Sequence, residues 1–276
     1  MALTDVAIQQ FLDQFINEYQ QVERKLAGSF QEYRNLIGDA FKIPIAGEVL
    51  MHDRGAFHSD IPPTIPAYSQ SIITFSNKIA LIPSDIFEQL EVNASERANY
   101  ARAAAWSIAR QEDQIGIDAL TASTTTNTVA VGTTNLTVDK IRTAAKLLDE
   151  DNVPMMDRFW AAHVDQKESL LSETQTTSTD FNTQRTLVNG QLDTFYGFKF
   201  IWFGNLTEGG LPKTGDDRTN FAWQKNAIAY GYRKNPSVTV DWDSKSQSWL
   251  IIPSVSMGAK EVQADGIVKI TCDETK

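Results

Sequence analysis

The 276-residue chain has one cysteine, Cys272, and only three histidines. A single cysteine excludes an intrachain disulfide and a zinc site built from several thiolates. No apolar run approaches the roughly 18 residues that a membrane-spanning helix needs, so we expect no transmembrane helix. The N-terminus MALTDVAIQQ lacks the basic and then apolar pattern of a signal peptide, so we expect no secretory leader.

Basic residues are outnumbered, with 25 Lys and Arg against 35 Asp and Glu, which gives a formal charge of −10. Proteins that grip nucleic acid need clustered positive charge, so this balance argues against such a role. The sequence also lacks a GxSxG elbow, a GxxxxGK[ST] loop and a GxGxxG turn. We therefore predict that the chain is not an enzyme and carries no cofactor.

The residues that could bind a metal do not form a known pattern. His52, Asp53, His58 and Asp60 match no closed zinc spacing, and we predict that they are solvated loop residues. The acidic run from Asp149 to Asp151 lacks the frame of a calcium loop. His163 stands in an apolar stretch, which favours a hydrogen-bonded histidine of the core or its rim. Cys272 has no nearby histidine or basic cluster in sequence. We predict no metal site.

The longest helical signal runs from Ser95 to Ala122, without proline and rich in Ala, Arg, Glu and Gln. Ser95 is a suitable N-cap, and Glu96 places negative charge at the positive end of the helix dipole. One apolar stripe at helical spacing is predicted to face the core: Ala98, Ala101, Ala105, Ile108, Ala109 and Ile115. Such a helix would be about 40 Å long.

A second helix is predicted from Asp5 to Leu36, broken near Gly28. Its apolar residues follow heptad spacing, which indicates either a seam against a partner helix or packing on its own domain. Between Phe41 and Ser76, prolines exclude a regular helix. There the segments GEVLMHDRG and QSIITFSNKIALI predict an extended hairpin with an irregular tip. A long loop of this kind needs a neighbouring surface or stays disordered.

Later segments predict alternating helices and strands. Thr137 caps a helix that ends at the stretch from Asp149 to Pro154. A buried strand follows from Arg158 to Val164, and then a short helix from Asp165 to Leu171. The remaining chain predicts strands: the aromatic run Phe195–Phe203, Asn226–Tyr232, Val238–Trp242, Trp249–Ile252, Ser256–Val262 and Ile267–Thr271.

This order of parts resembles the major capsid protein of tailed bacteriophages, with the Hong Kong ninety-seven-type fold, over nearly the whole chain. HDRGAFHSDIPP is similar to the family's extended E-loop, and the 95–122 helix to its spine helix. The most specific passage is LTVDKIRTAAKLLDEDNVPMMDRFWAAHVDQKESLL, with a helix, an Asn-Val-Pro turn, a strand and a helix ending in Leu-Leu. FYGF followed by a strand, and then KNAIA, is similar to the axial domain.

The resemblance implies an α+β fold and a structural protein of the virion, assembled in the host cytoplasm. It implies an N-terminal arm (1–40), an E-loop (41–80), a peripheral domain (81–173) with the spine helix 95–122, an axial domain (174–249) and a return to the peripheral domain (250–276). It also implies charged contacts between subunits, for which we select Arg34, Glu48, Asp53 and Arg54.

The expected partners are copies of the chain itself, as hexamers and pentamers of an icosahedral shell around double-stranded DNA bound without sequence-specific contacts. A portal and a decoration protein are further expected partners; a membrane is not. Some relatives crosslink an E-loop lysine, but no lysine lies between Gly47 and Asn77, so we predict no such bond. Because the arm before residue 41 is short, we expect a separate scaffolding protein.

Three alternatives remain open at this point. An encapsulin-like nanocompartment shares the fold and would hold a protein cargo in place of DNA. A hydrolase would show a deep pocket with perturbed titratable groups. A receptor-binding or tail module would form trimers in place of rings.

Overall fold

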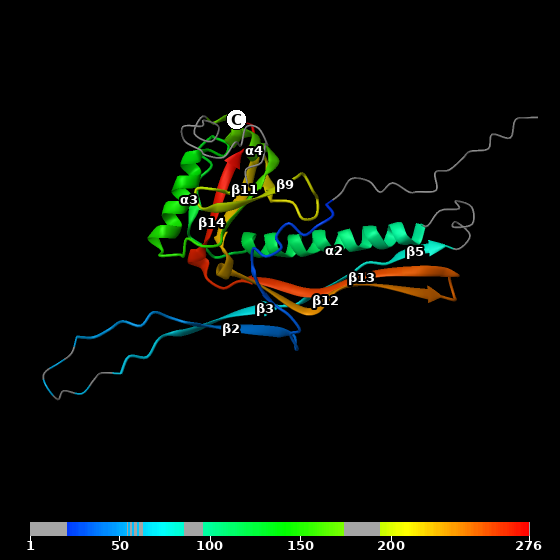
Figure 1. Ribbon diagram of the computed structural model, residues 1–276, viewed down its shortest axis with the longest axis horizontal. Coiled ribbons are helices and arrows are strands. Elements are labelled where there is room, and N and C mark those ends of the chain that lie inside the picture. Colours follow the sequence, from blue (N-terminus) through cyan, green and yellow to red (C-terminus); the bar gives the residue numbers. More distant parts are fainter. Residues whose placement is uncertain are drawn as a thin grey trace, which may run out of the picture.

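The computed structural model describes residues 21–53, 55, 57, 60, 63–85, 96–173 and 194–275. These residues form two packed units, each built on its own sheet, and a two-stranded ribbon that projects away from both (Figure 1).

The first unit is a five-stranded sheet under one long helix. The strands are β1 (Gln31–Tyr33), β12 (Ile228–Asp243), β13 (Ser248–Glu261), β4 (Ser76–Ile79) and β5 (Ile82–Asp85). Strands β12 and β13 form a long antiparallel hairpin, β1 pairs in parallel with β12, and β4 and β5 pair with β13. The helix α2 (Glu96–Thr121) lies along this hairpin (Figure 1).

The second unit is a seven-stranded sheet in the order β6-β14-β11-β7-β9-β8, with β10 paired to β11. Its strands are β6 (Thr128–Val129), β7 (Arg158–His163), β8 (Thr194–Phe195), β9 (Phe198–Phe203), β10 (Lys213–Thr214), β11 (Asp217–Gln224) and β14 (Ile267–Asp273). The helices α3 (Val138–Glu150) and α4 (Val164–Ser172) pack on one face, and the 3₁₀ turns η1 (Lys225–Ala227) and η2 (Ala264–Gly266) lead into β12 and β14.

Side chains of the seven-stranded sheet alternate between two hydrophobic cores, as the two-residue period of a strand requires. Phe221 and Trp223 of β11 enter the core shared with α2 and β12. Ala222, between them, enters the core beneath α3, together with Trp160. The core shared with α2 and β12 therefore contains side chains of both sheets and joins the two units. Together they form a stiff body from which the ribbon projects.

The ribbon consists of β2 (Ala40–Ala46) and β3 (Tyr68–Thr74), paired over seven residues. Pro44 lies within β2, which is possible because β2 pairs with a partner on one side only. The predicted hairpin is therefore present, but its first strand lies before GEVLMHDRG, whose described residues form no strand. The predicted second strand divides into β3, β4 and β5.

Several other predictions are confirmed. Helix α2 occupies the predicted range, although its Ser95 cap lies outside the described residues. Thr137 caps α3, with its side chain accepting the N–H of Lys140. Strand β7 and helix α4 lie where the sequence predicts them.

Two predictions about helices are wrong. Residues 21–36 contain turns and β1 in place of a helix, while the earlier part of that predicted helix lies outside the described residues. In α2, Ala105 of the predicted apolar stripe is exposed. Ile108 of that stripe is buried as predicted, whereas the other buried apolar side chains of α2 lie outside the stripe: Ala104, Ile117 and Leu120.

The sheet assignments of the C-terminal half need similar corrections. β12 and β13 are longer than predicted and absorb four predicted strands, and a turn at Tyr196 and Gly197 separates β8 from β9. The predicted domain boundaries stay a prediction. Residues 137–172, predicted as peripheral, pack with the seven-stranded sheet, whereas β12, within the predicted axial range, pairs beneath α2.

Candidate assembly elements

The arm root, defined here as Gln21 to Phe30, is anchored to α2 by a buried carboxylate. The Asp113 side chain is fully buried; its Oδ2 accepts the backbone N–H of Lys25 at 2.8 Å and its Oδ1 that of Leu26 at 3.0 Å. It also accepts a hydrogen bond from the Gln21 amide. Burial raises the pKa of Asp113, and the three donors oppose that shift. These bonds fix the arm root to the helix in one register.

An ion-pair cluster reinforces this anchor on the adjacent turn. The Arg24 guanidinium contacts Glu112 of α2 at 3.3 Å, and also Glu32 and the Tyr232 hydroxyl. Burial raises the pKa of Glu112, while the positive charge of Arg24 acts in the opposite direction. Paired buried charges of this kind are costly to separate, because a lone partner would lack solvent. The cluster therefore holds the arm root against both α2 and β12.

Apolar packing completes the arm root. Leu26 and Phe30 are buried, and the Phe30 ring lies 4.7 Å from that of Tyr230 in an edge-on arrangement. The helix approaches so closely at Gly116 that a Cβ there would lie 2.1 Å from the Tyr230 hydroxyl and 2.8 Å from Phe30. Only glycine fits at this position of α2.

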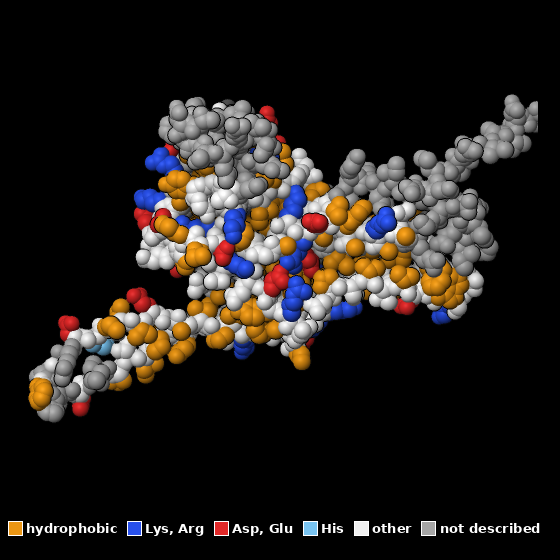
Figure 2. Space-filling model, viewed as in Figure 1, with side chains coloured by type: hydrophobic (Ala, Val, Ile, Leu, Met, Phe, Trp, Pro, Cys, Tyr) orange, Lys and Arg blue, Asp and Glu red, His pale blue; other side chains and the backbone are white. Residues whose placement is uncertain are grey.

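The ribbon presents the opposite kind of surface. Ile43 and Ile73 are buried against the body, but the described large apolar side chains between Val49 and Tyr68 are more than half exposed, and Met51 reaches 97%. Hydrophobic side chains extend along the projecting ribbon in Figure 2. A contiguous exposed apolar surface marks an interaction site in a folded protein. The side chains concerned are Val49, Leu50, Met51, Ile65 and Tyr68.

The four charged residues predicted at subunit contacts have different positions. Arg34 pairs with Glu32 at 2.8 Å and lies 5.1 Å from the Tyr232 ring centroid, so it already has partners within its own chain. Glu48 and Asp53 are exposed on the ribbon between β2 and β3. Arg54 lies outside the described residues. A role for these four in subunit contacts stays a prediction.

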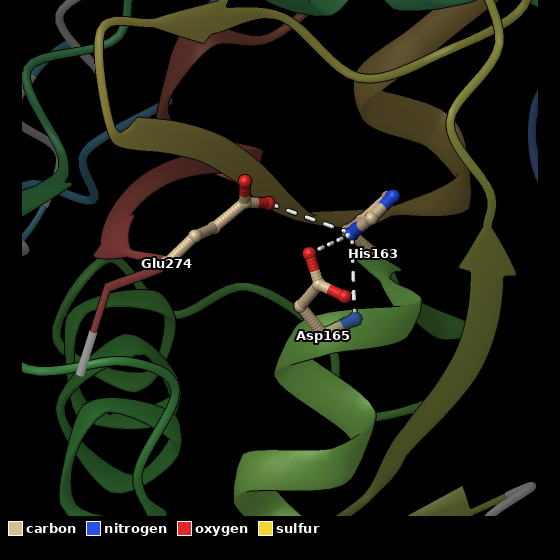
Figure 3. A group of neighbouring side chains, drawn as sticks. All are labelled: His163, Asp165 and Glu274. Carbon is tan, nitrogen blue, oxygen red and sulfur yellow. Dashed lines mark hydrogen bonds and ion pairs between the residues drawn. The ribbon is translucent and has the colours of Figure 1, made fainter.

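One group of potential metal ligands comes together at the end of β7: His163, Asp165 of α4 and Glu274 (Figure 3). The His163 Nδ1 lies 3.1 Å from an Asp165 carboxylate oxygen and 3.4 Å from Glu274 Oε1. It also accepts the Asp165 N–H at 3.3 Å, which caps α4. Burial lowers the pKa of His163, and the nearby Arg218 adds to this effect.

Glu274 is already neutralised by cations of the chain. Its carboxylate pairs with Arg218 and, at 2.6 Å, with the Lys213 ammonium, while Gln166 donates to it at 3.3 Å. These contacts lower the pKa of Glu274 to about 2 against the opposing effect of burial. A metal ion would have to displace Arg218 from the carboxylate. The group, here called the C-terminal clasp, therefore ties the end of β14 to β11 and α4.

The single cysteine is a core residue. Cys272 is fully buried, which raises the pKa of its thiol. Its sulfur lies 3.8 Å from the Lys140 ammonium, which donates to the carbonyl oxygens of Val131 and Thr134 at 2.7 Å each. The sequence did not indicate this contact, because Lys140 lies 132 positions before Cys272. The Lys140 side chain connects the loop before α3 to β14.

The hydrolase alternative finds no support in the groove beside α2. The groove between α2 and the edge of β4 has a volume of about 200 Å³, and its lining includes Lys78, Ser107 and Glu208. It holds one carboxylate, one lysine and two serines but no histidine or cysteine, so it lacks the histidine base that commonly activates a serine nucleophile. In the described part of the chain, no helix is long and apolar enough to cross a bilayer.

A stiff two-sheet body that keeps its apolar ribbon uncovered defines a class of protein that functions among copies of itself. The chain belongs to the phage capsid protein family, whose model matches residues 3–274. It is therefore a structural component of the virion and not an enzyme. This confirms the resemblance drawn from the sequence.

Solved structures show the same fold at low sequence identity. Mycobacterium phage Che8 matches with 20% identity, a TM-score of 0.73 and 99% coverage of both chains. The capsid of cyanophage P-SCSP1u matches with 13% identity, a TM-score of 0.79 and coverage of 97% of this chain and 93% of that one. The capsid of Helicobacter pylori bacteriophage KHP30 matches with 10% identity, a TM-score of 0.77 and 99% coverage of both. No curated protein sequence matches the chain.

Proposed function

We propose that many copies of this chain close into an icosahedral shell around double-stranded DNA, with hexamers and pentamers as its rings. The observation that carries the proposal is the ribbon, whose exposed apolar side chains between Val49 and Tyr68 are not covered by the described residues of the same chain. A surface of that kind marks a site of contact with another molecule, because covering it removes apolar area from water. A second copy of the same chain is the partner that a repeating shell provides.

The two units have different roles in this proposal. The seven-stranded sheet with α3 and α4, which includes residues 194–224 of the predicted axial domain, makes the contacts within rings. The five-stranded sheet with α2 carries the arm root and the ribbon, which join neighbouring subunits. Glu48, Asp53 and Arg54 supply charged contacts from the ribbon, and Arg34 supplies one from beside the arm root.

Charge supports the proposed contents of the shell. A formal charge of −10 opposes tight adhesion between subunits and phosphate groups, so packaged DNA stays mobile and is not bound in a sequence-specific manner. A separate scaffolding protein, a portal and a decoration protein are the further partners that we propose. Because no lysine lies between Gly47 and Asn77, the shell is held by non-covalent contacts.

Electron microscopy of particles purified from cells that express the chain, alone and with a candidate scaffolding protein, tests the proposal. We expect closed shells built from rings of six and five subunits, and nuclease-protected DNA in shells taken from phage. Intact mass should show monomers without a ladder of covalent multimers. A compact monomer whose ribbon is folded onto its own body would contradict the proposal, as would a trimer. Closed shells containing a protein cargo and no DNA would indicate a nanocompartment.

A further inference from the structure

Arg233 occupies an unusual position in the five-stranded sheet. The pairing of β12 with β13 shifts register there, because Tyr232 pairs with Met257 and Lys234 with the next residue, Ser256. Arg233 is thus the extra residue of a β-bulge. A bulge turns a side chain out of the regular alternation of a strand. Here it directs the guanidinium toward the place where the ribbon joins the sheet.

The guanidinium of Arg233 contacts the chain just before the ribbon and just after it. Its Nη1 donates to the Asp39 carboxylate at 3.2 Å and the Gly38 carbonyl at 3.4 Å, just before β2. Its Nη2 donates at 2.8 Å to the side-chain oxygen of Asn77 in β4, the sheet strand that follows β3, and the guanidinium lies 5.8 Å from the Phe75 ring centroid. One side chain therefore ties the entry and the exit of the ribbon together.

The guanidinium is also hydrogen-bonded to the neighbouring strand β13. Its Nε donates to the Ser256 hydroxyl at 3.1 Å, and that hydroxyl donates in turn to Asn77 at 2.7 Å. A single exposed ion pair contributes little. A planar guanidinium that donates to partners in three directions fixes their relative positions. A lysine ammonium on a flexible stem does not.

The floor beneath the ribbon's base is made of two glycines that pair across β12 and β13, Gly231 and Gly258. A Cβ on Gly258 would lie 2.0 Å from the Thr74 carbonyl oxygen and 3.0 Å from Ile73. A Cβ on Gly231 would lie 3.0 Å from Phe75. Ile73 is fully buried on this floor. The ribbon's base can therefore lie flat on the sheet, and Arg233 closes over its edge.

We propose that Arg233 is a positioning residue for assembly, which locks the angle at which the ribbon leaves the five-stranded sheet. Seven paired residues make a lever of about 23 Å, so a rotation of about 10° at the base moves the far end by about 4 Å. That displacement is as large as a side-chain contact. The ribbon can reach the same place on each neighbour only while its base is held at one angle.

The angle can be measured in the full-length chain kept unassembled at low concentration. Spin labels at Ser69→Cys on β3 and Arg102→Cys on α2 report the distance from ribbon to body, since both positions are exposed and native Cys272 is buried. We expect a narrow distance distribution in the parent chain. Arg233→Ala should broaden it at least twofold, and Arg233→Lys should restore it only in part.

Lys234→Ala is the matched control, because Lys234 bonds Ser254 within the sheet at 2.7 Å and should leave the distribution narrow. If Arg233→Ala does not fold, the double variant Asp39→Ala/Asn77→Ala removes two of the three side-chain acceptors of the guanidinium, one just before β2 and one in β4. It should broaden the distribution equally, with no further change when combined with Arg233→Ala. Distance distributions of equal width in the parent chain and these variants would contradict the proposed role of Arg233. Additive broadening in the combined variant would contradict it as well.

The role in assembly rests on the proposed function, and electron microscopy separates the two. Arg233→Ala should reduce the yield of closed shells at least tenfold, whereas Lys234→Ala should assemble like the parent. If the parent chain forms no shells, the proposed function fails, while the distance measurement still decides the lock. If the parent forms shells and Arg233→Ala keeps a narrow distribution, the lock is wrong and the proposed function stands.

Discussion

The arm root and the ribbon both extend from the unit built on α2, and they solve opposite problems. The arm root buries charge: Asp113, Glu112 and Arg24 are each paired within the chain. The ribbon exposes apolar surface, with Met51 almost completely accessible. The contacts of the arm root are formed within a single subunit, whereas those of the ribbon require another molecule. The comparison shows which contacts make the subunit and which make the assembly.

The largest effect is expected from charging the ribbon. The variant Leu50→Asp/Met51→Asp places carboxylates on the surface that a neighbour is proposed to cover, where unpaired charge is costly. We expect it to abolish closed shells in electron micrographs while the urea midpoint of the unassembled subunit changes little. Gln70→Glu, which adds charge to an exposed polar position of β3, is the control and should assemble. Normal shells from the double variant would remove the ribbon from the assembly contacts.

A smaller effect, on folding itself, is expected at the arm root. Asp113→Ala leaves the buried N–H groups of Lys25 and Leu26 without acceptors, at a cost of about 3 kcal/mol in the free energy of unfolding. Urea denaturation of the unassembled chain measures this loss. Asp118→Ala, on the exposed side of α2, should change stability by less than about 0.5 kcal/mol. Equal effects of the two substitutions would mean that the arm root is not anchored through Asp113.

Acid should weaken the C-terminal clasp and favour the arm root. The folded pKa of Glu274 lies below its usual value, so the clasp's stabilisation is present above about pH 4.5 and is lost as the pH falls toward about 2. The folded pKa of Asp113 is raised, so its contribution has the opposite sign: it is present below the ordinary carboxyl pKa and lost as the pH rises through the raised one.

Glu274→Gln tests this difference. Between pH 5.5 and pH 3 the parent chain should lose about 2 kcal/mol more than the variant in the free energy of unfolding, as measured by urea denaturation at each pH. Glu150→Gln is the control, because Glu150 is exposed beside Lys146 on α3. An acid-induced loss that is the same in the parent and Glu274→Gln would show that other groups govern the acid response.

The smallest effect is expected at Arg34, which lies between the arm root and the ribbon. Its side chain is 54% exposed and pairs with Glu32 at 2.8 Å. Arg34→Ala should lower the free energy of unfolding by less than about 0.5 kcal/mol, because exposed ion pairs contribute little. A strong loss of shells with unchanged stability would instead support the predicted subunit contact at this residue.

Local sequence signals were sufficient to predict those helices and strands whose first and last residues are set by their own sequence. The range of α2, the Thr137 cap of α3 and the apolar strand β7 each follow from propensity, capping or pattern over a few residues. The heptad spacing before residue 37 misled because the described part of that stretch is held by tertiary contacts. Leu26 is buried there in a turn, while Val22 of the same pattern is exposed.

The arm root could have been found in part. Asp113 falls one helical turn after Ala109 and one turn before Ile117, so a carboxylate interrupts an apolar stripe. Such an interruption signals a buried partner, but the partners Lys25 and Leu26 lie almost 90 positions away. No local pattern reveals a contact of that range. The bulge at Arg233 is equally silent in the sequence, because it depends on how β12 pairs with β13.

Methionine oxidation measured by mass spectrometry tests the central claim most directly. Met51 is 97% exposed in the single subunit, whereas Met257 is fully buried and serves as an internal reference. With a mild oxidant, Met51 should react quickly in unassembled subunits and at least tenfold more slowly in purified shells, while Met257 stays protected in both. Equal reactivity of Met51 before and after assembly would show that no neighbour covers the ribbon, and would contradict the account.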